Sequence, residues 1–357
     1  MKKINSLEYY TLIWFSIRAC FPELTFTIML HLIKEDTWVS ILIGAIIGVI
    51  PFIIYEKIKE KYPNDNLITI NKKIFPKLSK IINSLIIVMS LISAVYIFWI
   101  LIKFTNSLFL YKTNAWIISL ILIIPIYYAS TKDIHIISKI SLLLFFTSIL
   151  FQLLTTIGLI KNVDLNGIKP FLQSKTTNII YSSIIYISLN ISKLFFLTTI
   201  PKKRIKNYSF KKNLIMYIFT NITILNIVIA TTCTFGIDLT LLYEYPAFQV
   251  LKRVNILGIF NKVESILAIE AIFALFIQII IIIYYIKEIS NKKTNKYIPI
   301  LICLIIVIIS TNIFKTYKAE EVFFEKYLLY LISPIFILLP LITYVKTLHI
   351  QNNKELK

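Results

Sequence analysis

The chain has 357 residues, of which 57% are hydrophobic and 16% charged, and its formal net charge is +20. A soluble globular chain is about a quarter charged, so this composition and a mean hydropathy of +0.79 exclude an ordinary soluble domain. The basic residues are scattered between apolar runs and form no aromatic-rich basic domain, which argues against a nucleic-acid-binding protein.

Apolar runs occupy most of the chain and leave no room for a separate soluble domain. A helix needs about 20 mostly apolar residues to cross a bilayer, and about ten runs meet this requirement. We therefore predict an all-α polytopic membrane protein in which residues 1–357 form a single transmembrane domain. The predicted spans cover residues 9–33, 38–55, 81–102, 113–131, 140–160, 176–201, 213–237, 263–286, 297–314 and 327–345.

The basic residues favour one orientation. Segments on the same side as the N-terminus hold 24 of the 38 lysines and arginines, the opposite loops hold 12, and Arg18 and Lys193 lie inside spans. Cytoplasmic loops are enriched in lysine and arginine, so both termini are predicted to be cytoplasmic. The two intramembrane cations occupy the first and sixth spans, as discontinuous helices do in inverted-repeat transporters. This pattern predicts two inverted five-helix repeats, over about 7–161 and 176–347.

The first span contains a polar interruption with six candidate ligand-binding residues. Pro22 removes a helical hydrogen bond, and a charge at bilayer depth costs about 2.5–3.5 kcal/mol, so Arg18 and Glu23 require partners or a wet cavity. One interpretation is a broken helix that binds a small ligand; the other is a proline kink with an internal ion pair. The candidates are Ser16, Arg18, Ala19, Cys20, Pro22 and Glu23.

Gly44 and Gly48 in the second span form a small-xxx-small pattern, which predicts a close helix contact. The sixth span contains a polar cluster, in which Asn190, Ser192 and Lys193 are candidate ligand contacts. Lys193 either binds a ligand carboxylate or occupies the place of a coupling sodium ion. The alternative is that its side chain extends to the basic loop at the inner surface.

The eighth span carries Glu264 near its outer boundary and Glu270 about two turns deeper. Glu270 is either a structural hydrogen-bonded carboxylate or a proton carrier. Residues 243–262 before this span are long enough for a short amphipathic helix over the outer face. The cysteines Cys20, Cys233 and Cys303 are predicted to be packing residues. No nucleophile–base pair or histidine cluster is evident, so we expect no catalytic site, metal or cofactor.

Several further stretches carry a family resemblance. They are Asp36-Thr37-Trp38-Val39-Ser40, Tyr62-Pro63, Leu165-Asn166-Gly167-Ile168-Lys169-Pro170-Phe171, Tyr245-Pro246-Ala247-Phe248 and Leu257-Gly258-Ile259-Phe260-Asn261-Lys262-Val263-Glu264. The last two contain an aromatic–proline pair (Tyr245, Pro246), a glycine (Gly258) and a basic residue two before a glutamate (Lys262, Glu264). In these features the chain resembles the spore germination permease family, the B subunits of nutrient germinant receptors, within the amino acid/polyamine/organocation transporter superfamily. It departs from that family in having no glycine beside Pro22 or Asn190.

The resemblance implies a LeuT-like fold of two inverted five-helix repeats in the spore inner membrane. It also implies a nutrient site between spans one, three, six and eight, with Tyr96 and Trp99 as third-span wall residues. The implied activity is sensing of a small amino-acid-like nutrient, with a membrane-anchored A subunit and a C-subunit lipoprotein as partners. Two alternatives stay open: a proton-coupled secondary transporter of amino acids and a ligand-gated ion channel subunit.

Overall fold

The computed structural model describes residues 2–253, 263–289, 297–313 and 329–355, and these ranges are almost entirely helical. The helices of the first half are α1 (Ser6–Arg18), α2 (Phe26–Ile33), α3 (Thr37–Ile47), α4 (Val49–Lys61), α5 (Leu67–Ile74), α6 (Ser79–Leu108), α7 (Ala115–Ser130) and α8 (Ile134–Leu159). Those of the second half are α9 (Thr176–Leu189), α10 (Phe210–Phe235), α11 (Ile237–Leu242), α12 (Pro246–Gln249), α13 (Val263–Ile289), α14 (Tyr297–Ile313), α16 (Leu329–Ser333) and α17 (Leu339–Glu355).

Shorter helical turns interrupt or join these helices. Two are π-helical, η1 (Phe21–Thr25) and η9 (Pro334–Leu338), and each begins next to a proline. The longest 3-10 segment, η5 (Ile191–Thr199), continues α9. The remaining 3-10 turns are η2 (Lys34–Asp36), η3 (Ile160–Asn162), η4 (Leu165–Ile168), η6 (Lys202–Arg204) and η7 (Val250–Arg253).

The apolar helices confirm the prediction of an all-α polytopic membrane protein. Seven described helical runs are long and apolar enough to cross a bilayer, and α7 and α14 are shorter apolar helices. The first run, Ser6–Lys61, reverses direction near Lys34, where φ is 47°, and so passes along the bundle twice. Each predicted span coincides with helix over the described residues. The repeat boundaries at 7–161 and 176–347 stay a prediction.

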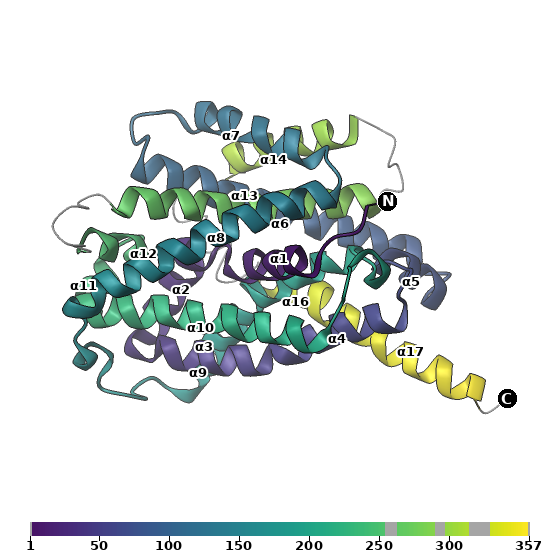
Figure 1. Ribbon diagram of the computed structural model, residues 1–357, viewed down its shortest axis with the longest axis horizontal. Coiled ribbons are helices and arrows are strands. Elements are labelled where there is room, and N and C mark those ends of the chain that lie inside the picture. The colour runs from purple at the N-terminus through teal and green to yellow at the C-terminus, as the bar shows by residue number, and fades with distance from the viewer. Residues whose placement is uncertain (1, 254–262, 290–296, 314–328, 356–357) are drawn as a thin grey trace.

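The long helices run roughly along the long axis of the molecule (Figure 1). The N-terminus, the C-terminus and α5 lie at one end, called here the N-terminal end. Helices α11 and α12 lie at the other, called here the far end. Helix α5, within a predicted loop, buries Leu67, Ile68 and Ile70 and exposes Lys72 and Lys73. This amphipathic pattern anchors the connection between α4 and α6 to the bundle.

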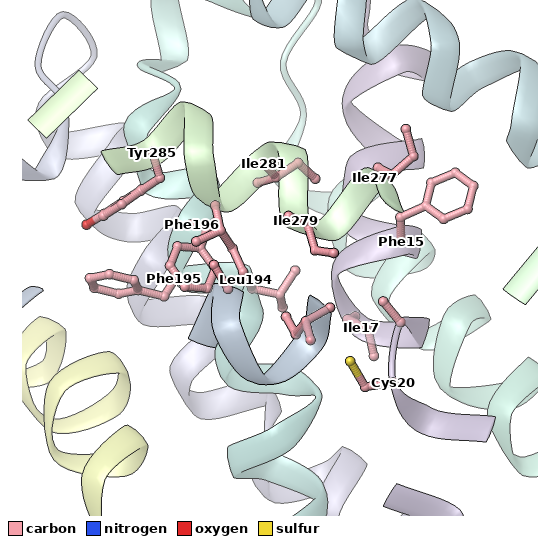
Figure 2. Packing of buried hydrophobic residues seen from close by; sticks show 14 of the residues in the cluster. Phe15, Ile17, Cys20, Leu194, Phe195, Phe196, Ile277, Ile279, Ile281 and Tyr285 are labelled. Atoms are coloured by element: carbon pink, nitrogen blue, oxygen red, sulfur yellow. The ribbon is translucent and has the colours of Figure 1, made fainter. Parts of the chain in front are cut away.

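The centre of the bundle is formed by α1, η5 and α13. Helix α1 is buried all round, because residues 9–18 are at most 6% exposed apart from half-buried Tyr10. Figure 2 shows Leu194, Phe195 and Phe196 of η5 beside Ile281 and Tyr285 of α13. The outer helices instead expose apolar residues suited to lipid, such as Ile117, Ile121 and Ile124 on α7.

The predicted small-residue contact is confirmed between α3 and α9. A Cβ atom added at Gly44 would lie 2.8 Å from Cδ1 of Tyr186 and 3.1 Å from the carbonyl oxygen of Ser183. One added at Gly48 would lie 2.2 Å from Cδ1 of Ile191. The Ser183 hydroxyl donates to the Ser40 carbonyl at 3.0 Å across the same contact. The glycines therefore let the second span approach the sixth closely.

Candidate functional site

The first span breaks between α1 and η1 without a glycine. Cys20 adopts a left-handed conformation with φ 72°, and Pro22 occupies the first turn of η1. The amides of Leu24 and Thr25 both donate to the Cys20 carbonyl, at 3.1 and 3.0 Å. The helix thus restarts through a wide π-helical turn, in which two amides bond to one carbonyl although the proline nitrogen has no N–H to donate. Cys20 therefore adopts, in place of a glycine, a backbone conformation that is strained for a residue with a side chain.

The sixth span breaks beside the first. Asn190 ends α9, and its side-chain amide donates to the carbonyl of Ile17 at 2.9 Å. That carbonyl lies in the last turn of α1, where no intrahelical donor is present. The ammonium of Lys193 lies 3.6 Å from Sγ of Cys20 and 4.8 Å from the ring centroid of Tyr96. The two discontinuities and the third span are therefore joined directly.

These contacts correct one interpretation of Lys193. The side chain does not extend to the inner surface, because Lys193 is 1% exposed and faces the break in the first span. The other candidates nearby are buried as well. Ser16 and Ala19 are fully buried on the first span, and the Ser192 hydroxyl donates to the Ser188 carbonyl of its own helix.

Arg18, the last residue of α1, forms an ion pair with Glu270 of α13. Both residues are buried, and the guanidinium lies 5.4 Å from the ring centroid of Trp14. The alternative of an ion pair within the first span is not observed, since the ion-pair partner of Arg18 is Glu270 and not Glu23. Glu270 therefore neutralises a buried cation, and its roles as a ligand contact or a proton carrier stay predictions.

A cavity of about 80 Å³ lies between this ion pair and α12 at the far end. Arg18, Pro22, Glu23 and Glu270 line it, so four of the predicted ligand residues meet there. Glu23 is 4% exposed, and its Oε2 has no hydrogen-bond partner in the described part of the chain. The rest of the wall comes from α6, α8, α10, α12 and α13.

The cavity differs in position from the site that the resemblance implies. Spans five and seven contribute to it through α8 and α10, whereas no lining residue comes from α9 or η5. Tyr96 instead faces Lys193 on the other side of the broken helix. Trp99 lines a separate surface pocket with Lys103 and Asn106.

Sequence reasoning missed the polar residues of α8 and α10. Gln152 and Asn226 line the cavity, together with Thr155 and Thr156. The Gln152 amide donates to the Thr223 carbonyl at 3.1 Å, and the Thr156 hydroxyl donates to Asn226 at 3.1 Å. Amide side chains are rare in otherwise apolar spans, and this rarity is the signal that points to them.

A second polar network lies at the N-terminal end and was also missed. The Glu56 carboxylate accepts from Tyr9 at 2.9 Å, Lys59 at 2.8 Å and Tyr208 at 2.8 Å, and it also accepts from Asn213. Lys59 lies beyond the predicted second span, which ends at residue 55, yet it is 2% exposed. Its burial is possible because the Glu56 carboxylate neutralises it.

The N-terminus is tied to the same region by backbone pairing. The Ile4 amide donates to the Arg204 carbonyl at 2.8 Å, and the Lys206 amide donates to the Ile4 carbonyl at 2.8 Å. Arg204 in turn donates to Asp133 at 2.8 Å. The start of α1 is therefore fixed to the connection that follows η5.

Comparison with known families decides the class of the protein. Residues 23–323 match the family described as spore germination protein. The chain belongs to the spore germination protein family. A search of curated proteins gives no match. The family match begins at Glu23, so the arginine of the buried ion pair precedes it.

The family stretches meet in space. Asp36 accepts hydrogen bonds from the amides of Leu172 at 2.6 Å and Ser174 at 2.8 Å, and Trp38 packs edge-on against Phe171 at 6.0 Å. The stretch that opens the second span therefore fixes the position of the segment that follows η4.

At the far end, Tyr245 packs edge-on against Phe104, with ring centroids 5.2 Å apart. Pro246 begins α12, the short helix predicted in this loop. Gly258 and Lys262 lie outside the described residues, and only the backbone of Glu264, in α13, is described. Within the described ranges, His, Cys, Asp and Glu form no group that could hold a metal.

Proposed function

We propose that this spore germination family protein is the nutrient-sensing subunit of a germinant receptor, and that it binds a small amino-acid-like ligand in the membrane. The carrying observation is the cavity beside the broken first span, lined by Arg18, Glu23 and Glu270. Sites for small molecules combine apolar walls with a few convergent polar groups. The cavity has this composition, since Phe104 and Ile227 line it together with the charged residues.

In this proposal the ligand acts by shifting a conformational equilibrium. A ligand at Glu23 contacts η1, whose neighbours α1 and α13 are joined by the Arg18–Glu270 pair. Conversion of a 1:99 population into 99:1 requires about 5.5 kcal/mol of preferential binding to one state. The shift is passed to a membrane-anchored A subunit and a C-subunit lipoprotein. Binding alone performs this work, so the protein is proposed not to be an enzyme and to need no cofactor.

The proposed location is the spore inner membrane, with both termini in the cytoplasm. The distribution of lysine and arginine supports this orientation, because the segments at the N-terminal end carry 24 of the 38. The cavity then lies toward the outer half of the membrane, where a nutrient arrives.

Secondary transport is the second candidate, with a specific observation in its favour. Two helix breaks in contact, with Asn190 bonded to the Ile17 carbonyl, resemble the discontinuous helices at which transporters bind substrate and ions. In that case the ligand crosses the membrane, coupled to protons. A ligand-gated ion channel subunit instead predicts a conductance that depends on ligand.

The deciding experiment measures dipicolinate release from spores with and without this gene, across a panel of amino acids and their derivatives. Loss of the response to one nutrient supports the receptor and names its ligand. Unchanged germination together with lost solute uptake in vegetative cells contradicts the receptor and supports transport. A ligand-dependent conductance in the purified, reconstituted protein supports the channel.

A further inference from the structure

We propose that the cavity selects ligands with a net positive charge: an ammonium group bound by Glu23, attached to a small apolar body. The free zwitterionic amino acid is disfavoured. This inference rests on the proposed function only in taking the cavity as the ligand site, and it specifies the ligand's chemical class.

The first argument is the charge balance of the wall. The described lining residues include one cation, Arg18, and two carboxylates, Glu23 and Glu270. Arg18 is engaged by Glu270, so these two charges neutralise each other. Glu23 forms no ion pair among the described residues, and burial of a charged carboxylate is unfavourable unless a cation pairs with it.

The second argument is the unsatisfied bonding of buried polar atoms on this wall. Glu23 is 4% exposed and its Oε2 lacks a hydrogen-bond partner among the described residues. Gln152 is 9% exposed, and its Oε1 likewise has none in that part of the chain. Both atoms are acceptors, and an ammonium supplies three donors and no acceptor.

The third argument concerns the rest of the ligand. A zwitterion brings a carboxylate, and no lining cation free of an ion pair is present among the described residues to receive it. Phe104, Ile227 and Phe248 give the wall apolar surface in addition to its polar residues. A small inorganic cation would leave this apolar surface uncovered. An apolar body fills this space better.

The test is equilibrium binding of radiolabelled L-leucinamide to the full-length protein, purified in detergent and in nanodiscs at pH 7. L-leucine and 4-methylpentanoate are competitors that keep the same apolar chain: leucine is a zwitterion, and 4-methylpentanoate is an anion without the ammonium group. We expect leucinamide to bind saturably, leucine to compete about tenfold or more weakly, and 4-methylpentanoate and sodium chloride at matched ionic strength not to compete. Equal competition by leucine, or displacement by sodium alone, overturns the inference.

Variants locate the binding group. Glu23→Gln is expected to weaken leucinamide binding about tenfold or more, and Glu23→Asp, which keeps the charge, to retain the preference for the cation. The control is Glu35→Gln, at a half-exposed carboxylate in η2 that does not line the cavity. If Glu23 is protonated and neutral, glutamine mimics it, and unchanged binding to Glu23→Gln overturns the inference. Thermal denaturation of each variant verifies folding. The ligand selectivity is measured on the wild-type protein and so does not depend on the folding of the variants.

The two proposals fail in different ways. Cation-selective binding that depends on Glu23, without any effect of gene deletion on germination, overturns the receptor function and keeps the cavity's selectivity. A germination defect with no preference for leucinamide over leucine keeps the receptor and overturns the selectivity.

Discussion

Arg18 and Glu270, 252 residues apart in the sequence, form an ion pair in the interior of the bundle. The pair joins the end of α1 to α13 and closes one wall of the cavity. Desolvation makes such a pair costly to form but more costly to break, since the remaining charge has no partner.

The single variants Arg18→Ala and Glu270→Ala are expected to lower the free energy of unfolding by about 3–5 kcal/mol each. The double variant Arg18→Met/Glu270→Leu removes both charges and is expected to recover most of that loss. Denaturant unfolding in detergent, followed by tryptophan fluorescence, measures all three. Additive losses in the double variant would mean that the two charges do not interact.

Lys193→Ala and Arg18→Ala are expected to abolish the ligand response while leaving membrane insertion intact. Lys193 holds the third span to the break of the first through Tyr96 and Cys20, so its removal disconnects these elements. Dipicolinate release gives the response, and immunoblots of the membrane fraction give the protein level. Loss of both variants from the membrane fraction would assign these residues a structural role alone.

Gly44→Val is expected to destabilise the protein by about 1–3 kcal/mol, because a larger side chain separates α3 from α9. The neighbouring carbonyl of Ser183, 3.1 Å from the added Cβ, is backbone and cannot move aside cheaply. The thermal midpoint in detergent measures the loss. Ile46→Val on the lipid-exposed side of the same helix is the control and should leave the midpoint unchanged.

Tyr208→Phe is expected to cost about 1.5–3 kcal/mol at pH 7, because it removes a hydrogen bond to the charged Glu56. Burial, and then the nearby Glu56 carboxylate, raises the pKa of the Tyr208 hydroxyl above its ordinary value. The folded state therefore keeps a proton that the unfolded state loses above about pH 10. The stabilising contribution is complete below that pH and declines above it.

The measurement for this network is the free energy of unfolding at pH 7 and at pH 10–11. Tyr208→Phe should show a smaller alkaline decline than the wild type. An identical alkaline decline in Tyr208→Phe would contradict the assignment.

Asp36→Ala is expected to release the segment after η4, because the carboxylate accepts from the amides of Leu172 and Ser174. The loss is about 1.5–3 kcal/mol for hydrogen bonds to a charged group. Limited proteolysis from outside right-side-out vesicles should cleave near residues 165–175 faster than in the wild type. Glu35→Ala, one residue earlier, is the control. Equal cleavage rates in Asp36→Ala and wild type would refute the role of the carboxylate.

The class, the spans and the presence of a close helix contact at Gly44 and Gly48 follow from sequence because they depend on local composition and spacing. The break of the first span was also predictable, since Pro22 and two charges interrupt an apolar run. The left-handed Cys20 was not, because a non-glycine residue adopts that conformation only when surrounding contacts hold it.

Partners across the bundle could not be read from the sequence. Nothing near Arg18 identifies Glu270 over Glu23, and nothing near Lys59 distinguishes a buried lysine from a solvated one. Gln152 and Asn226 acquire meaning only when α8 and α10 are seen to face the same cavity. Such pairings depend on helix rotation and packing, which hydropathy does not encode.

Backbone bonds at Ile4 and the Asn190 bond at Ile17 hold the two ends of α1 to opposite ends of the segment that contains η5. Helix α1 is therefore held at both ends, so that a displacement of one end is transmitted to the other. A shift of η1 at the cavity would therefore move the contact between the first and sixth spans at the N-terminal end. An N-terminal truncation that removes Ile4 would release the start of α1 without changing any residue that lines the cavity.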